Sequence, residues 1–105
     1  MNNVQLIGRL TRDPETRYTA GQMAVCTFTI AIDRQKKDGE KKTDFPRITV
    51  FGKQAESVGQ YLKKGRLVGV QGSISTGSYQ DKNGATVYTT DIIADRVEYL
   101  DNLEF

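Results

Sequence analysis

The stretch that decides the fold lies in the middle of the chain and reads Asp44-Phe45-Pro46-Arg47-Ile48-Thr49-Val50-Phe51-Gly52-Lys53. Its residues alternate with a period of two, which is the pattern of a β-strand. The inward set of this strand is predicted to be Pro46, Ile48 and Val50. A short apolar stripe of this kind indicates a thin β core.

The other face of the same strand carries two large aromatic residues, Phe45 and Phe51, beside Arg47 and Thr49. Aromatic rings on a core face normally have aliphatic neighbours, so this face is unusual for a structural strand. If further strands covered it, Phe51 would instead be a core residue. The alternation alone leaves both interpretations open.

A short amphipathic helix is predicted directly after this strand, from Lys53 to Lys64. Its apolar residues have helical spacing, basic residues occupy its last turn, and a glycine stands where a C-cap belongs. The apolar residues are Ala55, Val58 and Leu62. The basic residues are Lys63 and Lys64, and the glycine is Gly65.

Two strands are predicted before this region. The first covers residues 4–11 and contains Gly8, which in a strand often marks a bend or bulge. Turns at Asp13-Pro14 and at residues 19–22 lead to the second strand, residues 23–32. Its inward set is predicted to be Ala24, Cys26, Phe28, Ile30 and Ile32. Residues 33–43 contain no apolar residue and are predicted to form a mobile basic hairpin loop.

Two long strands, residues 67–79 and 85–100, complete the pattern around Asp81-Lys82-Asn83-Gly84. The Asn-Gly pair is a strong hairpin signal. The predicted order is therefore three strands, one helix and two strands. This all-β order is that of an OB-fold, a five-stranded Greek-key barrel, here with one short helix between the third and fourth strands.

Composition limits the chemistry of the chain. A length of 105 residues fits one domain. One cysteine, Cys26, and no histidine argue against a disulfide, a metal site or a catalytic centre, and we expect no cofactor. Residues 1–90 hold 14 Lys and Arg and 8 Asp and Glu, whereas residues 91–105 hold one Arg and five acids. This basic body favours polyanionic partners, although a solvated basic surface gives the same count.

Binding of single strands without sequence readout needs cations near phosphates and exposed rings on which bases stack. The chain offers both kinds of residue. The candidate stacking residues are Phe45, Phe51, Tyr79 and Tyr88, and the candidate phosphate contacts are Arg47, Lys53, Lys63, Lys64 and the basic loop with Arg34, Lys36 and Lys37.

Nearly the whole chain resembles the bacterial and phage single-stranded DNA-binding proteins. In the first half of the chain the resemblance rests on Asn3-Val4-x-Leu6-Ile7-Gly8-Arg9-Leu10, on Asp13-Pro14-Glu15-x-Arg17-Tyr18-Thr19, and on the stretch from Thr43-Asp44-Phe45 to Val50-Phe51-Gly52-Lys53. In the second half it rests on Ala55-Glu56, on Tyr61-Leu62-x-Lys64-Gly65 and on Tyr79-x-Asp81-x-x-Gly84-x-x-x-Tyr88-x-Thr90. It implies an OB-fold, assembly as a homotetramer, stacking on Phe45, Phe51 and Tyr79, and phosphate contacts from Arg17, Arg47, Lys53 and Lys64.

The chain departs from the family pattern at three places. The loop after the second strand reads Asp33-Arg34-Gln35-Lys36-Lys37 and lacks an aromatic, and Thr76-Gly77-Ser78 lacks the usual basic residues. We expect domain residues 1–100 followed by a short acidic end, 101–105, without the family's linker or full acidic tail. Docking of replication and repair proteins through that end is left open.

Two other functions are weighed against DNA binding. The first is an OB-fold that serves as a protein-interaction or replication-restart module and binds DNA weakly. The second is a small nuclease, which would need metal-binding acids, but Asp91, Asp95 and Glu98 form no recognisable metal motif. No apolar run approaches the ~18 residues of a membrane helix, and the start resembles no signal peptide. We therefore expect a cytoplasmic protein without a membrane partner.

Overall fold

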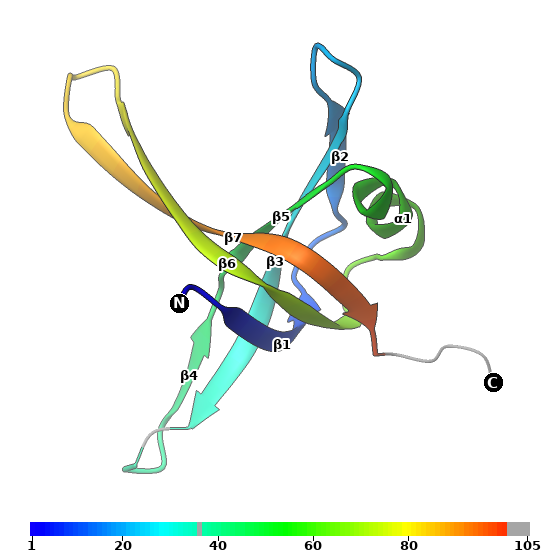
Figure 1. Cartoon of the computed structure of the whole chain (residues 1–105). Coiled ribbons are helices and arrows are strands. Elements are labelled where there is room, and N and C mark those ends of the chain that lie inside the picture. Colours follow the sequence, from blue (N-terminus) through cyan, green and yellow to red (C-terminus); the bar gives the residue numbers. More distant parts are fainter. Residues whose placement is uncertain (36, 101–105) are drawn as a thin grey trace.

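The computed structural model describes residues 1–35 and 37–100. Within these residues the chain forms seven strands and one helix (Figure 1). In chain order they are β1 (Val4–Leu10), β2 (Glu15–Tyr18), β3 (Ala24–Gln35), β4 (Lys41–Asp44), β5 (Arg47–Phe51), α1 (Lys53–Tyr61), β6 (Leu67–Gln80) and β7 (Thr86–Tyr99).

Five of the strands close into a barrel, which confirms the predicted OB-fold. The ring runs β1-β6-β7-β5-β3 and returns to β1 through the pairs Arg9↔Ala31 and Leu10↔Ile30. All contacts in the ring are antiparallel except the parallel pair of β5 and β7. The two short strands lie outside the ring and pair with β3.

Close approach of β1 to β3 explains the glycine in the first strand. A Cβ atom built on Gly8 would lie 2.6 Å from the carbonyl oxygen of Ala31. Any side chain at this position would therefore push the two strands apart where the barrel closes. The sequence pattern had indicated a bend or bulge here, whereas β1 pairs with β6 in continuous register through Gly8, so the close approach to β3 is what requires glycine.

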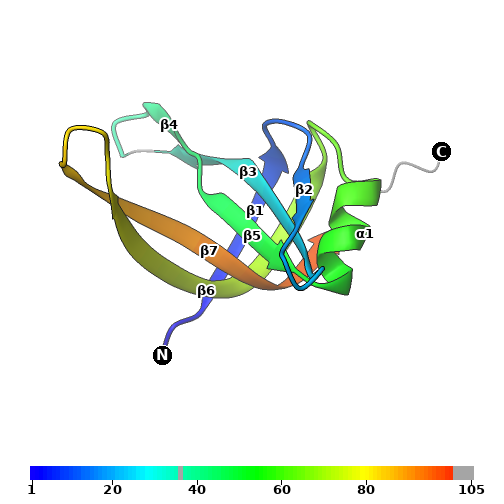
Figure 2. The same ribbon diagram turned by 90° about the horizontal axis from the view of Figure 1, so that it is seen from above.

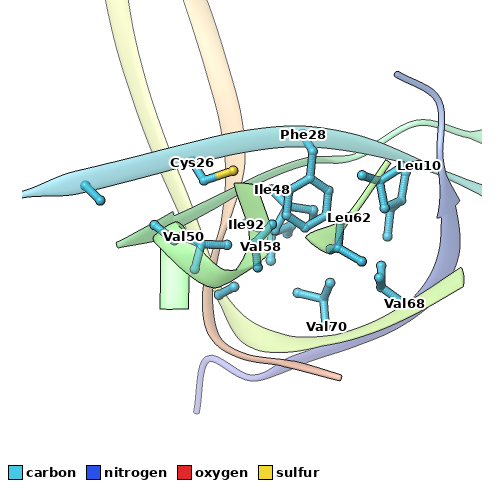
Figure 3. Packing of buried hydrophobic residues seen from close by; sticks show 14 residues of the cluster. Leu10, Cys26, Phe28, Ile48, Val50, Val58, Leu62, Val68, Val70 and Ile92 are labelled. Atoms are coloured by element: carbon cyan, nitrogen blue, oxygen red, sulfur yellow. The ribbon is translucent and has the colours of Figure 1, made fainter. Parts of the chain in front are cut away.

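The core fills the barrel with aliphatic side chains around Phe28, as Figure 3 shows. The predicted inward residues Ala24, Cys26, Phe28 and Ile30 are buried, as are Ile48 and Val50. Ile32 and Pro46 are half-buried, because they lie where the barrel opens toward its hairpins. Val25 is also buried although it alternates onto the other face, since it lies between Arg17 of β2 and Phe51 of β5.

The helix covers one end of the barrel and is shorter than predicted. Gly52 turns the chain from β5 into α1 with a φ of 75°, a conformation that favours glycine. The helix ends at Tyr61, because Leu62 adopts extended backbone and places its side chain in the core. Lys63, Lys64 and Gly65 therefore follow the helix, and their prediction as its last turn and C-cap was wrong.

Two hairpins extend from the barrel on the side away from α1 (Figure 2). One is formed by β6 and β7, whose tip carries a carboxylate of Asp81 that accepts the backbone N–H groups of Asn83 and Ala85. The other is formed by β3 and β4, paired from Ile32↔Asp44 to Gln35↔Lys41. The prediction of one long loop over residues 33–43 was wrong, because ladder hydrogen bonds extend the strands through a charged sequence.

The predicted strand over residues 44–53 is interrupted. β4 ends at Asp44 and β5 begins at Arg47, and Pro46 between them has no N–H to donate to a ladder. Its carbonyl still accepts the N–H of Ile30 at 3.2 Å. The short strand β2 was not predicted, since its four residues lie between two turn signals. Within the described residues, α1 falls short of the length and apolar character needed to cross a bilayer.

Candidate nucleic-acid interface

Strand pairing shows which predicted site residues share a face, because directly paired residues point to the same side of a sheet. Phe51 pairs with Val25, and Val25 pairs with Arg17. Arg47, Thr49 and Phe51 are every second residue of β5 and so point to one side. Thr49 pairs with Ile93 of β7. These residues lie on the outside of the barrel, which settles the open question about Phe51 against a core position.

The same outer face continues onto the long hairpin. Val87, Thr89, Asp91 and Ile93 alternate along β7 on this side, and Tyr79 of β6 pairs with Val87. Tyr79 thus belongs to the same face as Phe51, although 28 positions separate them in the sequence. Phe51 is 44% exposed and Tyr79 is 57% exposed; Phe45, which lies between β4 and β5 and lines a groove with Arg47, is 61% exposed and is included with them. We call this surface, with Arg17 and Arg47, the outer aromatic face.

Tyr88 lies on the opposite face of the hairpin. It pairs with Ser78, and alternation places both on the side of Ile74 and Ile92, which continues into the barrel interior. Its side chain is 80% exposed. The structure therefore separates Tyr88 from the other three candidate stacking residues, and its contact with DNA stays a prediction.

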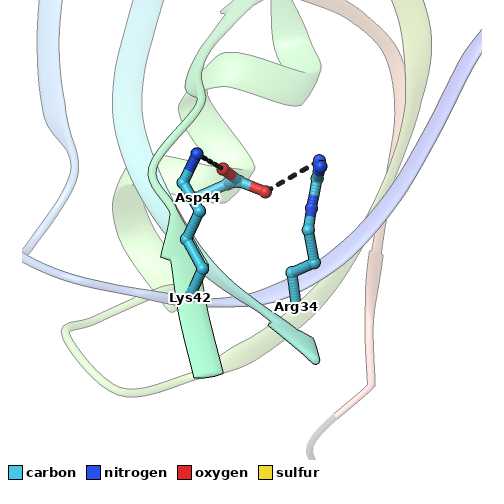
Figure 4. A network of polar contacts seen from close by, with 3 residues as sticks. All are labelled: Arg34, Lys42 and Asp44. Carbon is cyan, nitrogen blue, oxygen red and sulfur yellow. Dashed lines mark ion pairs between the residues drawn. The ribbon is translucent and has the colours of Figure 1, made fainter. Parts of the chain in front are cut away.

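Arg34 also lies on the inner side. Asp44 pairs with Ile32, whose side chain is directed to the barrel interior. Arg34 is two residues from Ile32 along β3 and therefore points to the same side. The Asp44 carboxylate lies 3.0 Å from Arg34 Nη2 and 3.9 Å from Lys42 Nζ (Figure 4). One acid therefore partly neutralises two cations of the β3–β4 hairpin. Lys37 lies exposed at the tip of this hairpin, and Lys36 lies outside the described residues.

The remaining predicted lysines border the outer face near α1. Lys53 is the first residue of the helix and follows Phe51 by two positions. Lys63 and Lys64 are exposed after the helix, and the backbone N–H of Lys64 donates to Asp13 Oδ1 at 2.8 Å. This bond ties the loop after α1 to the turn after β1. Lys53 thus lies close to Phe51 along the chain, whereas Lys63 and Lys64 lie beyond the other end of α1.

A groove of about 510 Å³ opens beside Phe45. Sequence reasoning missed it, because its walls come from separate segments. They include Arg12 and Asp13 of the turn after β1, Glu15 of β2, Thr27 of β3, and Phe45 and Arg47. Arg47 Nε lies 3.9 Å from Asp91 Oδ1, a long contact between partly exposed groups. Such a pair holds the guanidinium only weakly.

Among the described residues no three His, Cys, Asp or Glu side chains gather closely enough to hold a metal ion. Cys26 is buried, and this burial raises the pKa of its thiol, which opposes formation of the nucleophilic thiolate. Cys26 is thus a core side chain.

Five-stranded Greek-key barrels of this kind form the OB-fold class, which is used to bind oligonucleotides and oligosaccharides. Residues 1–100 match the model of the Single-strand binding protein family. The chain belongs to this family.

Individual relatives agree with the family match. Single-stranded DNA-binding protein 3 of Clostridium acetobutylicum is 52% identical over 103 residues, which cover 96% of this chain and 72% of that protein. The Single-stranded DNA-binding protein of Clostridium tetani is 50% identical, with 96% and 71% covered. A chain from the structure of a Plasmodium falciparum SSB complex with ssDNA superposes with a TM-score of 0.89 at 32% identity, and 96% of both chains is covered.

Proposed function

We propose that this protein binds single-stranded DNA on its outer aromatic face. The observation that carries the proposal is that strand register places exposed Phe51 and Tyr79 on one side of the sheet with Arg17 and Arg47, and that Phe45 lines the groove with Arg47. Exposed rings accept any base, because every base has a π-face, and nearby cations hold the backbone. Recognition of this kind is independent of sequence.

The phosphate contacts follow the edges of this face. Arg17, Arg47 and Lys53 lie closest to the aromatic residues, and Lys63 and Lys64 extend the basic edge past α1. The β3–β4 hairpin adds a second basic group with Arg34 and Lys37, to which we add Lys36 from the sequence alone. The names of the relatives and the ssDNA in the Plasmodium falciparum complex support a DNA ligand.

We further propose a biological setting for this binding. Single strands arise during replication, recombination and repair, and a sequence-independent cover would protect them in the cytoplasm, where bacterial DNA lies. Residues 1–100 form the binding domain and 101–105 a short acidic end. The functional unit is a homotetramer, and contacts with replication and repair proteins are a further part of this proposal. We assign the chain no reaction.

A direct titration tests the proposed function. A fluorescently labelled oligo(dT) is titrated with the protein and followed by anisotropy at two salt concentrations, with a duplex of the same length as control. Tight binding of the single strand that weakens with salt supports the proposal. Micromolar or weaker binding at low salt would favour a protein-interaction module instead. Sedimentation with and without oligo(dT) gives the number of subunits, and a monomer in both conditions would contradict the tetramer.

A further inference from the structure

The groove beside Phe45 combines a stacking wall with groups that bind base edges. Phe45 is 61% exposed and forms one side, and Arg47 and Arg12 bring guanidinium groups to it. Glu15 of β2 also lines the groove, as does Thr27, its paired residue in β3. A volume of about 510 Å³ lies in the range of ordinary small-ligand sites, so one nucleotide has room to enter.

Glu15 is the acid best placed to contact such a nucleotide. The other carboxylate of the groove, Asp13, already accepts the backbone N–H of Lys64 at 2.8 Å. In the part of the chain that the structure describes, no hydrogen bond or ion pair engages the carboxylate of Glu15. Glu15 is also exposed, and a carboxylate offers acceptors only.

An acceptor-only group distinguishes bases by their donors. Cytosine carries an exocyclic amino group that donates to carboxylates, whereas the same position of uracil or thymine is a carbonyl oxygen, which a carboxylate repels. Adenine also offers an amino donor. Stacking on Phe45 supplies affinity for every base, and the edge contact then favours some of them.

We infer that this groove is a nucleotide subsite in which Glu15 favours bases with an exocyclic amino group over bases that carry a carbonyl oxygen at that position. The inference rests on the proposed binding of single-stranded DNA and adds a base preference at one position of an otherwise sequence-independent surface. Phe45 stacks the base, Glu15 accepts its amino group, and Arg47 or Arg12 holds the adjoining phosphate. Glu15 is thus a specificity-determining residue.

Two homopolymers test the inference, because they place the same base in the groove in every register. Oligo(dC) and oligo(dU) of equal length present different base edges: cytosine carries an amino group where uracil carries a carbonyl oxygen. Dissociation constants are measured by anisotropy for the wild type, Glu15→Gln and Glu15→Ala. Loss of a negative charge strengthens binding of both oligonucleotides, so only the ratio of the two constants reports a base contact.

We expect both variants to shift this ratio toward oligo(dU) by about fivefold or more relative to the wild type. Glu15→Gln should shift it further than Glu15→Ala, since the introduced amide donates to the uracil carbonyl. Glu56→Gln serves as the matched control, because Glu56 is an exposed acid of α1, and it should leave the ratio unchanged. Unchanged melting temperatures establish that all variants fold.

The outcomes separate this inference from the proposed function. If the wild type binds both oligonucleotides but Glu15 variants keep its ratio, the subsite assignment is wrong and single-strand binding stands. If Glu56→Gln shifts the ratio equally, a general charge effect replaces the base contact. If the wild type binds neither oligonucleotide at low salt, the proposed function itself fails.

Discussion

At the residue scale, the decisive contrast is between two phenylalanines on neighbouring strands. Phe28 is 4% exposed and lies at the centre of the core, whereas Phe51 is 44% exposed on the outer aromatic face. Both residues alternate in strands, so sequence pattern alone does not separate their roles. Register separates them. Phe28 pairs with buried Ile48, whereas Phe51 pairs with Val25, which pairs in turn with Arg17 of β2.

Phe51→Ala should weaken single-strand binding by ~1 to 3 kcal/mol while the protein stays folded, since one stacked base loses its ring. Anisotropy with oligo(dT) and urea denaturation measure the two effects. Phe28→Ala is the matched control and should cost ~3 to 5 kcal/mol of folding stability. Lost folding stability of that size in Phe51→Ala, with intrinsic affinity retained, would make Phe51 a structural residue.

Lys53→Ala should flatten the dependence of log K on log salt by about 0.7, the value for one phosphate on a single strand. Lys53 is exposed at the start of α1, so folding should be unaffected. Arg96→Ala provides the comparison, because Arg96 Nη2 pairs with Glu98 Oε1 at 2.8 Å. Equal slopes for Lys53→Ala and the wild type would remove Lys53 from the contact set.

At the scale of elements, the β3–β4 hairpin combines residues that we propose to bind DNA with a competing acid. Asp44 holds Arg34 and Lys42 on the free protein, so a phosphate that approaches these cations must replace a carboxylate. Exposed ion pairs of this kind add little folding stability. Their main effect is therefore on the electrostatics of DNA binding.

Asp44→Asn should raise the affinity for oligo(dT) at low salt and steepen the salt dependence, because two cations become available to phosphates. Asp38→Asn removes the same charge from the tip of this hairpin without releasing an ion pair, since Asp38 accepts the backbone N–H of Glu40. Anisotropy across a salt series compares the two variants. Identical behaviour would reduce the effect of Asp44 to net charge.

The order of the five barrel strands and the helix could be predicted from the sequence, and so could the shared face of Phe45, Arg47 and Phe51, although alternation alone left the exposure of Phe51 open. The separation of Tyr88 and Arg34 from that set could not, because it depends on register across β6–β7 and β3–β4, which alternation in one strand does not fix. The groove was missed because Glu15 and Phe45 meet only after β2 and β5 have both paired with β3. The helix end was misplaced because burial of Leu62 overrode the lysines and glycine that follow it.

At the scale of the whole molecule, closure of the barrel maintains the geometry of the outer aromatic face. The ring closes where β1 pairs with β3, beside Gly8. The N-terminal half of the same strand β3 pairs with both β2 and β5. Anything that opens this contact should loosen the groove and the aromatic face together. Fold and site are thus coupled through one central strand.

Gly8→Ala should lower the free energy of unfolding by ~1 to 3 kcal/mol, since its Cβ would overlap the Ala31 carbonyl. Urea denaturation followed by circular dichroism measures the change. Gly21→Ala is the control, because the nearest atom to its Cβ would be Thr19 Oγ1 at 3.9 Å. Equal stability of Gly8→Ala and the wild type would show that the strands separate there without cost.

The most direct test of binding on the outer aromatic face is photocrosslinking to a single strand that carries 5-bromodeoxyuridine, followed by peptide mapping with mass spectrometry. Crosslinks should concentrate on Phe45, Phe51 and Tyr79. The exposed Tyr61 on α1 provides an internal reference, because it lies on the helix and outside this face. Crosslinks that favour Tyr61, or that spare all three residues of the outer aromatic face, would contradict the proposed binding surface.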